Sequence, residues 1–190
     1  MSEAHPLIQI VDEHDVPLRG GTMDEAQLSG LWHRIASIMV QDRDSGEFLV
    51  QKIAANPYYN GGKWNLTASG HVDEGETYEE TAMRELFEEM GIRGLQLIEF
   101  SYYQTEKQDH RAGRDRVYRR YNQVFIAYAD KAELEISPRP QEVEDWAWMR
   151  LDQLFSDDIP KVDKLARFVQ DYEKEQHMLS KERGLDDAIR

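Results

Sequence analysis

One short segment of this chain specifies a helix together with both of its ends. Thr77 has the side chain of a helix N-cap, and Glu80 follows three residues later, which completes a capping box. Gly91 stands where helices commonly end in the left-handed conformation, which glycine adopts without steric cost. The sequence therefore predicts a helix over residues 77–90 with a defined start and end.

The two sides of this predicted helix differ in chemistry. Glu85, Glu88 and Glu89 are spaced so that their carboxylates project from adjoining parts of one face, within reach of one cation. Mg²⁺ prefers such oxygen ligands and keeps phosphate oxygens and waters as the others, so we predict a Mg²⁺ site, with Mn²⁺ as the alternative ion. The same spacing also occurs on solvated acidic helices, and that interpretation stays open. The opposite side is apolar and is expected to dock on a sheet through Ala82, Met83, Leu86 and Met90.

Apolar runs between turn-forming residues predict strands on both sides of the helix. The expected ranges are 7–11 with 16–18, 35–40 with 48–53, 95–103 and 117–129 around a polar loop at 105–116, and 143–149. Residues 56–63 contain two glycines and predict a surface loop. Apolar residues at helical spacing from Val162 to Tyr172 predict an amphipathic C-terminal helix.

Length and composition favour one domain of the α+β class. The chain has 190 residues, of which 40% are hydrophobic, and this suffices for one packed core. No repeat or Pro/Gly/Ser-rich linker marks an internal boundary. We expect a single domain over residues 1–190, with a short N-terminal β-hairpin extension within 1–30 and a C-terminal helix at about 160–180.

Charge and cysteine content exclude several functions. A formal net charge of −14 argues against general binding to nucleic acids or anionic membranes, whose phosphates would repel this surface. The chain has no cysteine, which excludes disulfides, thiolate metal sites and thiol nucleophiles. It also has no signal segment at its start and no apolar run of about eighteen residues, so we expect a cytoplasmic protein without a membrane span.

Residues 70–92 resemble the Nudix box. The matching positions are Gly70, Glu76, Arg84, Glu85, Leu86, Glu88, Glu89, Gly91 and Ile92. This resemblance implies a Nudix fold, a mixed β-sheet sandwiched between α-helices, in which a loop, helix and loop hold a metal against a diphosphate. It implies a Nudix hydrolase that cleaves a diphosphate linkage in a nucleoside diphosphate linked to another moiety, or in a similar small anionic metabolite.

The resemblance also implies roles for individual residues. Glu85, Glu88 and Glu89 would be metal ligands, and the carbonyl of Ser69 would add an oxygen. Support of the site is expected from Gly70, Glu76, Arg84 and Gly91, because an ion pair between Glu76 and Arg84 can join the helix entry to the catalytic turn. Either Glu85 or Glu142 is expected to help deprotonate the attacking water. For Glu142, an ordinary loop acid is an equally open interpretation.

A second resemblance spans most of the chain and points to the isopentenyl diphosphate isomerase-like branch of the Nudix superfamily. It is carried by residues 11–13, 31–34, 69–71 and 142–143. The isomerases act through a cysteine that falls at Ser69, and through acids where this chain has Arg120 and its two preceding residues, so isomerisation is disfavoured. His33 and His71 match metal-binding positions of the isomerases, but an earlier histidine is replaced by Ala26. Structural roles through ring hydrogen bonds are therefore favoured for both histidines.

Five arginines lie within ten residues of an otherwise acidic chain, namely Arg111, Arg114, Arg116, Arg119 and Arg120. Guanidinium groups bind phosphate oxygens in bidentate geometry, so we predict that Arg111, Arg114 and Arg116 bind substrate. A solvated hairpin or a subunit contact, as in a homodimer, is the alternative. The expected partner is a small diphosphate-containing molecule. Isopentenyl diphosphate isomerase-like activity, and a non-catalytic sensor of a nucleotide-linked metabolite, are the alternative functions.

Overall fold

The computed structural model describes residues 6–55, 60–111 and 113–187, without the side chains of Arg111 and of residues 182–187. Part of the expected loop 56–63 therefore lies outside the described residues. The strands are β1 (Ile8–Val11), β2 (Pro17–Gly21), β3 (Trp32–Asp42), β4 (Phe48–Ile53), β5 (Trp64–Asn65), β6 (Ala68–His71), β7 (Ile98–Arg111), β8 (Arg114–Ala129) and β9 (Val143–Met149). The helices are α1 (Met23–Ser29), α2 (Tyr78–Met90), α3 (Leu151–Phe155) and α4 (Asp163–Asp187).

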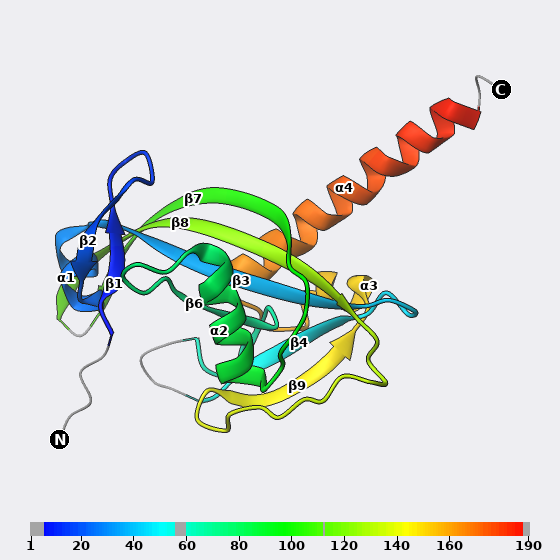
Figure 1. Ribbon diagram of the computed structural model, residues 1–190, viewed down its shortest axis with the longest axis horizontal. Coiled ribbons are helices and arrows are strands. Elements are labelled where there is room, and N and C mark those ends of the chain that lie inside the picture. Colours follow the sequence, from blue (N-terminus) through cyan, green and yellow to red (C-terminus); the bar gives the residue numbers. More distant parts are fainter. Residues whose placement is uncertain (1–5, 56–59, 112, 188–190) are drawn as a thin grey trace.

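Strand β3 is the centre of one mixed sheet (Figure 1). It pairs parallel with β8 along its whole length and antiparallel with β1, β4 and β6. Strand β7 continues the sheet beyond β8, and β9 and β5 continue it beyond β4. The expected pairing of residues 35–40 with 48–53 is confirmed, because β3 and β4 form that hairpin.

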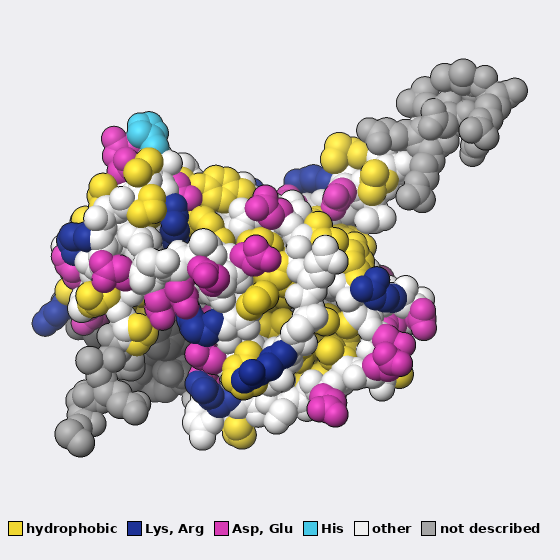
Figure 2. All heavy atoms as spheres, in the orientation of Figure 1, with side chains coloured by type: hydrophobic (Ala, Val, Ile, Leu, Met, Phe, Trp, Pro, Cys, Tyr) yellow, Lys and Arg dark blue, Asp and Glu magenta, His cyan; other side chains and the backbone are white. Residues whose placement is uncertain are grey.

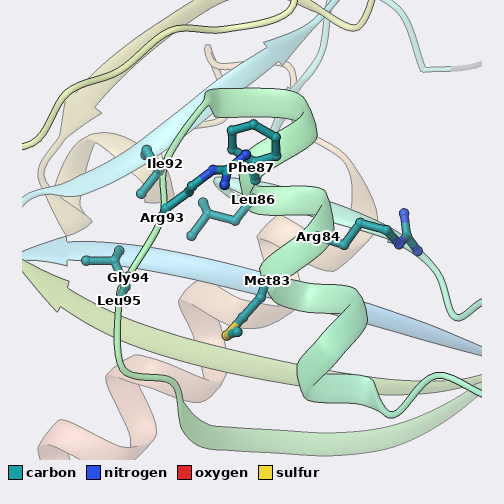
Figure 3. A pocket seen from close by; sticks show the side chains of 8 residues that line it. All are labelled: Met83, Arg84, Leu86, Phe87, Ile92, Arg93, Gly94 and Leu95. Atoms are coloured by element: carbon teal, nitrogen blue, oxygen red, sulfur yellow. The ribbon is translucent and has the colours of Figure 1, made fainter.

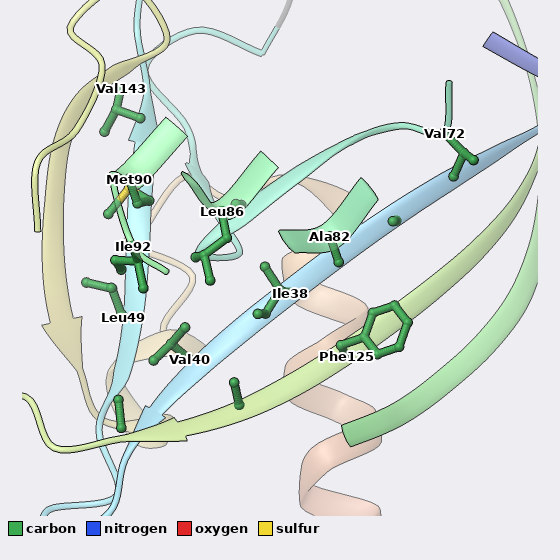
Figure 4. Close-up of a cluster of buried hydrophobic side chains, with 14 residues drawn as sticks. Ile38, Val40, Leu49, Val72, Ala82, Leu86, Met90, Ile92, Phe125 and Val143 are labelled. Carbon is green, nitrogen blue, oxygen red and sulfur yellow. The ribbon is translucent and has the colours of Figure 1, made fainter. Parts of the chain in front are cut away.

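Helices cover both faces of the sheet, which confirms the α+β arrangement of a mixed sheet between helices. Helix α2 packs on one face, where Ala82, Leu86 and Met90 point at Ile38 and its neighbours (Figure 4). Met83 was wrongly assigned to this face. It is 49% exposed, because a residue directly after Ala82 is turned by about 100° around the helix axis. Helices α3 and α4 cover the other face, through Leu154, Leu165, Phe168, Val169 and Tyr172, and Val162 directly before α4 packs with them.

The capping of α2 agrees with the sequence prediction at both ends. The Thr77 hydroxyl accepts from the Glu80 amide, and the Glu80 carboxylate accepts from the Thr77 amide at 2.8 Å. Gly91 has φ 73° and donates its N–H to the carbonyl of Phe87 at 2.9 Å. The helix therefore starts and ends where its sequence requires.

The expected polar loop at 105–116 is wrong. These residues extend β7 and β8 into a long hairpin whose pairing continues to Arg111 and Arg114. Cross-strand charge pairs hold this arm together, such as Arg119 with Glu106 at 3.2 Å, and opposite charges facing one another across strands are stabilising. An arm of this kind buries little apolar surface, so it lacks the hydrophobic alternation by which strands are predicted.

The N-terminal β-hairpin is joined to the loop that precedes α2. The expected strands appear as β1 and β2, and α1 follows them, which the sequence analysis did not predict. Gln9 donates its amide to the Val72 carbonyl at 2.7 Å, and the Glu74 amide donates to the Leu7 carbonyl at 2.7 Å. The Glu74 carboxylate also accepts from the Gly20 amide at 2.6 Å. The hairpin thereby fixes the path of residues 72–75.

Helix α4 starts on the sheet and then leaves it (Figure 1). Its apolar side chains Leu165, Phe168, Val169 and Tyr172 are buried, and the side chains of residues 173–181 are exposed. The expected C-terminal helix at about 160–180 is thus present and continues to Asp187. In the part of the chain that the structure describes, no helix combines the length and the apolar character that crossing a membrane takes.

Candidate active site

The carboxylate side of α2 lies against the short strand β6. Gly70 on β6 faces this helix, and a Cβ atom there would lie only 1.8 Å from Oε1 of Glu85. Any side chain at position 70 would therefore collide with that carboxylate. Gly70 lets the carboxylate lie directly on the strand.

Glu85 is mostly withdrawn from solvent, with 12% of its side chain exposed. Its Oε1 accepts from Nη1 of Arg84 at 2.8 Å. Burial raises the pKa of Glu85, the neighbouring Arg84 opposes this rise, and the charges of Glu88 and Glu142 add to it. Glu85 thus lies among other acids with one direct cationic partner.

Glu89 is buried, and the chain itself supplies its hydrogen-bond donors. Its Oε2 accepts from Nε2 of Gln51 at 2.5 Å and from the Ser69 amide at 3.2 Å. Burial raises the pKa of Glu89, and the charge of Glu85 adds to this rise, while Lys164 opposes it. Ser69 also accepts a hydrogen bond from Nζ of Lys164 through its hydroxyl. Ser69 is therefore contacted by an acid at its amide and by a base at its side chain.

Arg84 links the start of α2 to its carboxylate side. Its guanidinium pairs with Glu76 at 3.0 Å and donates to the His71 carbonyl at 3.2 Å. The Glu88 carboxylate lies 3.7 Å from the same guanidinium. The ion pair expected between Glu76 and Arg84 is present, and it joins the loop before the helix to Glu85 and Glu88.

Glu142 is brought close to α2 by the segment before β9. The amide of Ser137 donates to the Met90 carbonyl, and the amide of Arg139 donates to the Glu89 carbonyl, both at 2.9 Å. The Glu142 carboxylate pairs with Arg139 at 2.8 Å and is close enough to Glu85 to raise its pKa. The structure therefore places Glu142 beside the box carboxylates.

The carboxylate oxygens of Glu85, Glu88 and Glu89 are the kind of ligand that a hard divalent cation prefers. Glu89 is buried and Glu85 is mostly withdrawn from solvent, and the charge of Glu85 helps to raise the pKa of Glu89, so a cation between them would relieve that repulsion. Within residues 6–55, 60–111 and 113–187, however, no three His, Asp or Glu side chains are arranged to hold a metal ion. Glu85 is instead turned to Arg84, and Glu89 to Gln51 and Ser69. Convergence of the three carboxylates thus requires rotation of these side chains.

A model of the NUDIX domain family matches residues 31–172. The chain belongs to the Nudix family. Isopentenyl-diphosphate Delta-isomerase 2 of Photorhabdus laumondii is 32% identical over 146 residues, which cover 76% of this chain and 77% of that protein. A Yersinia pestis protein described as an uncharacterized Nudix hydrolase is 34% identical over 101 residues, which cover 53% of this chain and 55% of its own length.

Solved structures show the Nudix fold. A protein of Deinococcus radiodurans superposes with a TM-score of 0.68 at 17% identity, over 86% of this chain and 96% of its own. The Nudix domain of Shewanella oneidensis NrtR, crystallised with ADP ribose, has a TM-score of 0.56 at 14% identity, over 76% of this chain and 88% of its own. The expected fold is thereby confirmed, and the family match over residues 31–172 confirms the resemblance to the Nudix family.

The arginines predicted to bind substrate lie on the β7–β8 arm. Arg116 pairs with Asp24 at 2.9 Å and donates to Gln27 at 2.7 Å, so it holds α1 against the arm. Arg114 is exposed near the end of the arm. The side chain of Arg111 lies outside the described residues. Substrate binding by these three arginines stays a prediction.

His33 on β3 and His71 on β6 lie side by side, with ring centroids 5.4 Å apart. Nδ1 of His33 bonds the Leu31 carbonyl at 3.0 Å, as expected for a structural histidine. Burial lowers the pKa of His33 to about 4. The Nε2 atoms of both rings are buried and have no hydrogen-bond partner among the described residues.

A hollow on the outer side of α2 is separate from the carboxylates (Figure 3). It is lined by Met83, Phe87 and Leu95 among others, and the guanidinium of Arg93 lies over the Phe87 ring at 3.4 Å. Arg84 points away from the other labelled side chains. On the molecular face in Figure 2, basic and acidic side chains are mixed with hydrophobic ones. The hollow is mainly apolar and does not fit a diphosphate.

Lys164 and Gln51 are the site residues that the sequence analysis missed. A lysine in the first turn of an amphipathic helix is typical of a solvated position, and a glutamine within an apolar run carries no signal of its own. Only the fold brings Lys164 to Ser69, which is 95 positions away in the chain.

Proposed function

We propose that this chain hydrolyses a diphosphate linkage in a nucleoside diphosphate linked to another moiety, or in a similar small anionic metabolite, with Mg²⁺ or Mn²⁺. The observation that carries the proposal is the withdrawal of Glu85 and Glu89 from solvent beside β6, where burial raises the pKa of both and the charge of Glu85 adds to the rise at Glu89. Buried acids that repel one another are costly unless a cation joins them. The family and the complete Nudix box support the same conclusion.

The proposed roles follow from the contacts. Glu85, Glu88, Glu89 and the Ser69 carbonyl would hold the ion, which when bound neutralises charge on the phosphoryl oxygens. Arg84 orients Glu85 and Glu88 from its pair with Glu76. Glu85 or Glu142 would accept the proton of the attacking water. Glu142 has the more accessible carboxylate, since 40% of its side chain is exposed.

Isomerisation is the second candidate because several relatives carry that name, among them the Photorhabdus laumondii protein. The chain has serine at position 69, and a hydroxyl is a much weaker acid than the thiol that the isomerases use. That hydroxyl accepts its hydrogen bond from Lys164. Residues 118–120 stand where the isomerases have acids, and none of the three is acidic. Formation of dimethylallyl diphosphate from isopentenyl diphosphate, measured directly, distinguishes the two reactions.

The decisive experiment is a panel of diphosphate compounds incubated with Mg²⁺, with products read by mass spectrometry. Release of two phosphorylated fragments identifies the bond that is cleaved. Glu88→Gln and Glu89→Gln are expected to lower turnover by orders of magnitude while the fold survives, because each removes a charge from a repelling group. Glu79→Gln is the matched control, since Glu79 is exposed on the same helix.

Full turnover in pure Glu88→Gln or Glu89→Gln protein would refute the ligand assignment. Tight binding of a nucleotide-linked metabolite without any product under Mg²⁺ would instead favour the non-catalytic sensor.

A further inference from the structure

Four basic side chains gather on the sheet face that α4 covers, and the proposed reaction does not use them. We call His33, His71, Arg120 and Lys164 the basic cluster. We propose that the basic cluster binds a phosphate-type anion and not a metal ion. This inference rests on the proposed function in one respect, namely that the anion is a phosphoryl group of the substrate.

Strand register places three of these residues on one face. His33 on β3 pairs with Arg120 on β8, and Ile35, two residues after His33, pairs with His71 on β6. Paired residues, and residues two apart on a strand, share a face of the sheet. Lys164 reaches the same face from the first turn of α4, because its Nζ donates to the hydroxyl of Ser69. Strands β3, β6 and β8 and helix α4 therefore build the cluster jointly.

The charges of this cluster act on one another. Arg120 lies opposite His33 in the register of β3 and β8, and the ammonium of Lys164 contacts Ser69, two residues from His71. Burial lowers the pKa of His33 to about 4, so its imidazole is neutral near pH 7. A divalent cation on the two rings would meet a guanidinium and an ammonium at close range, which opposes metal binding. An anion would be attracted by the same two groups.

The hydrogen-bonding state of the rings also fits a phosphate. Nδ1 of His33 faces the Leu31 carbonyl and must therefore carry the proton, which leaves Nε2 as an acceptor. A terminal phosphate, with its second pKa near 6, keeps one O–H for part of the time at neutral pH, whereas a phosphoryl group esterified on both sides has none. That O–H can donate to Nε2, while guanidinium and ammonium donate to the other oxygens. The buried ring nitrogens without partners then find one in the ligand.

Ser69 connects the basic cluster to the box carboxylates. Lys164 donates to its hydroxyl, while Glu89 accepts from its amide. A substrate that lies across Ser69 would place the reacting phosphoryl group beside Glu85 and Glu89 and a terminal phosphate at Lys164 and Arg120. We therefore expect the substrate to carry a second anionic group next to the phosphoryl group that reacts.

The test is calorimetric titration of inorganic phosphate into the full chain in excess EDTA, where no turnover occurs. We expect binding by the wild-type protein, and a loss of affinity of about tenfold or more in Lys164→Met and in Arg120→Gln, because each removes a charged hydrogen bond. Matched controls are Lys174→Met on the exposed part of α4, and Arg119→Gln, whose side chain pairs with Glu106. Both controls should bind as the wild type does.

A spectroscopic measurement covers the case in which a variant fails to fold. In ¹⁵N-labelled wild-type protein, phosphate should shift the Nε2 resonance of His33, whereas Mg²⁺ or Zn²⁺ should not. Phosphate affinity that is unchanged in both variants, or a His33 resonance that responds to metal and not to phosphate, would overturn the inference even if diphosphates are hydrolysed. A third outcome separates the two proposals. If the wild type binds phosphate, both variants lose that binding and no diphosphate is hydrolysed, then the anion site is supported and the proposed hydrolysis is wrong.

Discussion

Gly70 determines how closely a carboxylate can approach the strand beneath it. The absent side chain leaves room for Glu85, whose Oε1 would otherwise lie 1.8 Å from a Cβ atom. The conformation of Gly70 is that of an ordinary strand residue, so its glycine is required by this close approach. Glycine is needed at position 70 because it has no side chain, and not because it can adopt unusual backbone angles.

Gly70→Ala tests this steric role. The added methyl group should displace Glu85 and separate α2 from β6, with a loss of about 1–3 kcal/mol in the free energy of unfolding, as overpacking commonly causes. Mg²⁺ affinity, measured by calorimetry, should fall together with stability. Unchanged Mg²⁺ affinity in a folded variant would show that the position of Glu85 is not critical for the ion.

Arg84→Met tests whether the ion pairs of Arg84 with Glu76 and Glu85 stabilise the protein. The change leaves the partly buried carboxylates of Glu76 and Glu85 without their main donor, which should cost about 1–3 kcal/mol in a urea unfolding measurement. Arg150→Met is the control, because Arg150 and Asp152 form an exposed pair, for which about 0–1 kcal/mol is expected. Equal losses in the two variants would contradict a special role for Arg84.

The residues of the box could be predicted because they act within one short segment. Glu85, Glu88 and Glu89 follow from helical spacing, and the ion pair of Glu76 with Arg84 follows from the same geometry. Lys164 could not be predicted, because its contact with Ser69 depends on where α4 docks on the sheet. The orientation of the carboxylates toward Arg84 and Gln51 also depends on neighbours that spacing does not reveal.

At the scale of elements, α2 shows that capping residues can define a helix completely. Thr77, Glu80 and Gly91 were sufficient to locate both ends. Helix α1 has the same kind of signal, since Thr22 accepts from the Glu25 amide and Gly30 ends the helix at φ 62°. That helix has only seven residues, and its signal was obscured by the hairpin expected over residues 1–30.

Thr77→Ala should remove the N-cap of α2 and lower the free energy of unfolding by about 1 kcal/mol, visible as a lower Tm. Glu79→Gln in the same turn is the control, because Glu79 has an exposed side chain without a capping contact. A variant with wild-type Tm would show that packing on the sheet alone defines the start of the helix.

The β7–β8 arm shows where pattern reasoning fails for strands. Its pairs beyond Thr105 join polar residues, such as Lys107 with Tyr118 and Asp109 with Arg116. Backbone hydrogen bonds form in such a ladder whatever the side chains are, so polarity alone does not separate an exposed hairpin from a loop. The arm also explains why Arg116 meets α1.

The whole molecule contains a buried histidine whose protonation depends on folding. His33 has a pKa of about 4 when folded, against an ordinary value of 6.5, and burial is the main cause. Between these pH values the imidazole of His33 binds more protons in the unfolded chain, so the contribution of His33 to the free energy of unfolding should fall as the pH decreases from about 6.5 toward 4. The shift corresponds to about 3 kcal/mol at most.

Urea unfolding at pH 7 and pH 5 in phosphate-free buffer measures this effect. His33→Gln keeps a donor toward the Leu31 carbonyl but does not titrate, so its stability should change less between the two pH values. His110→Gln is the control, because His110 is exposed and pairs with Asp115. The same pH dependence in wild type and His33→Gln would exclude His33 as its source.

The first thirty residues precede the span that the family model matches, which begins at residue 31. Yet Gln9 and Gly20 bond directly to the loop that leads into the Nudix box. A version of this chain trimmed to residues 31–172 would keep every box residue and lose the brace that positions the loop holding Glu76. The family span alone is therefore expected to hold this loop less rigidly than the longer chain does.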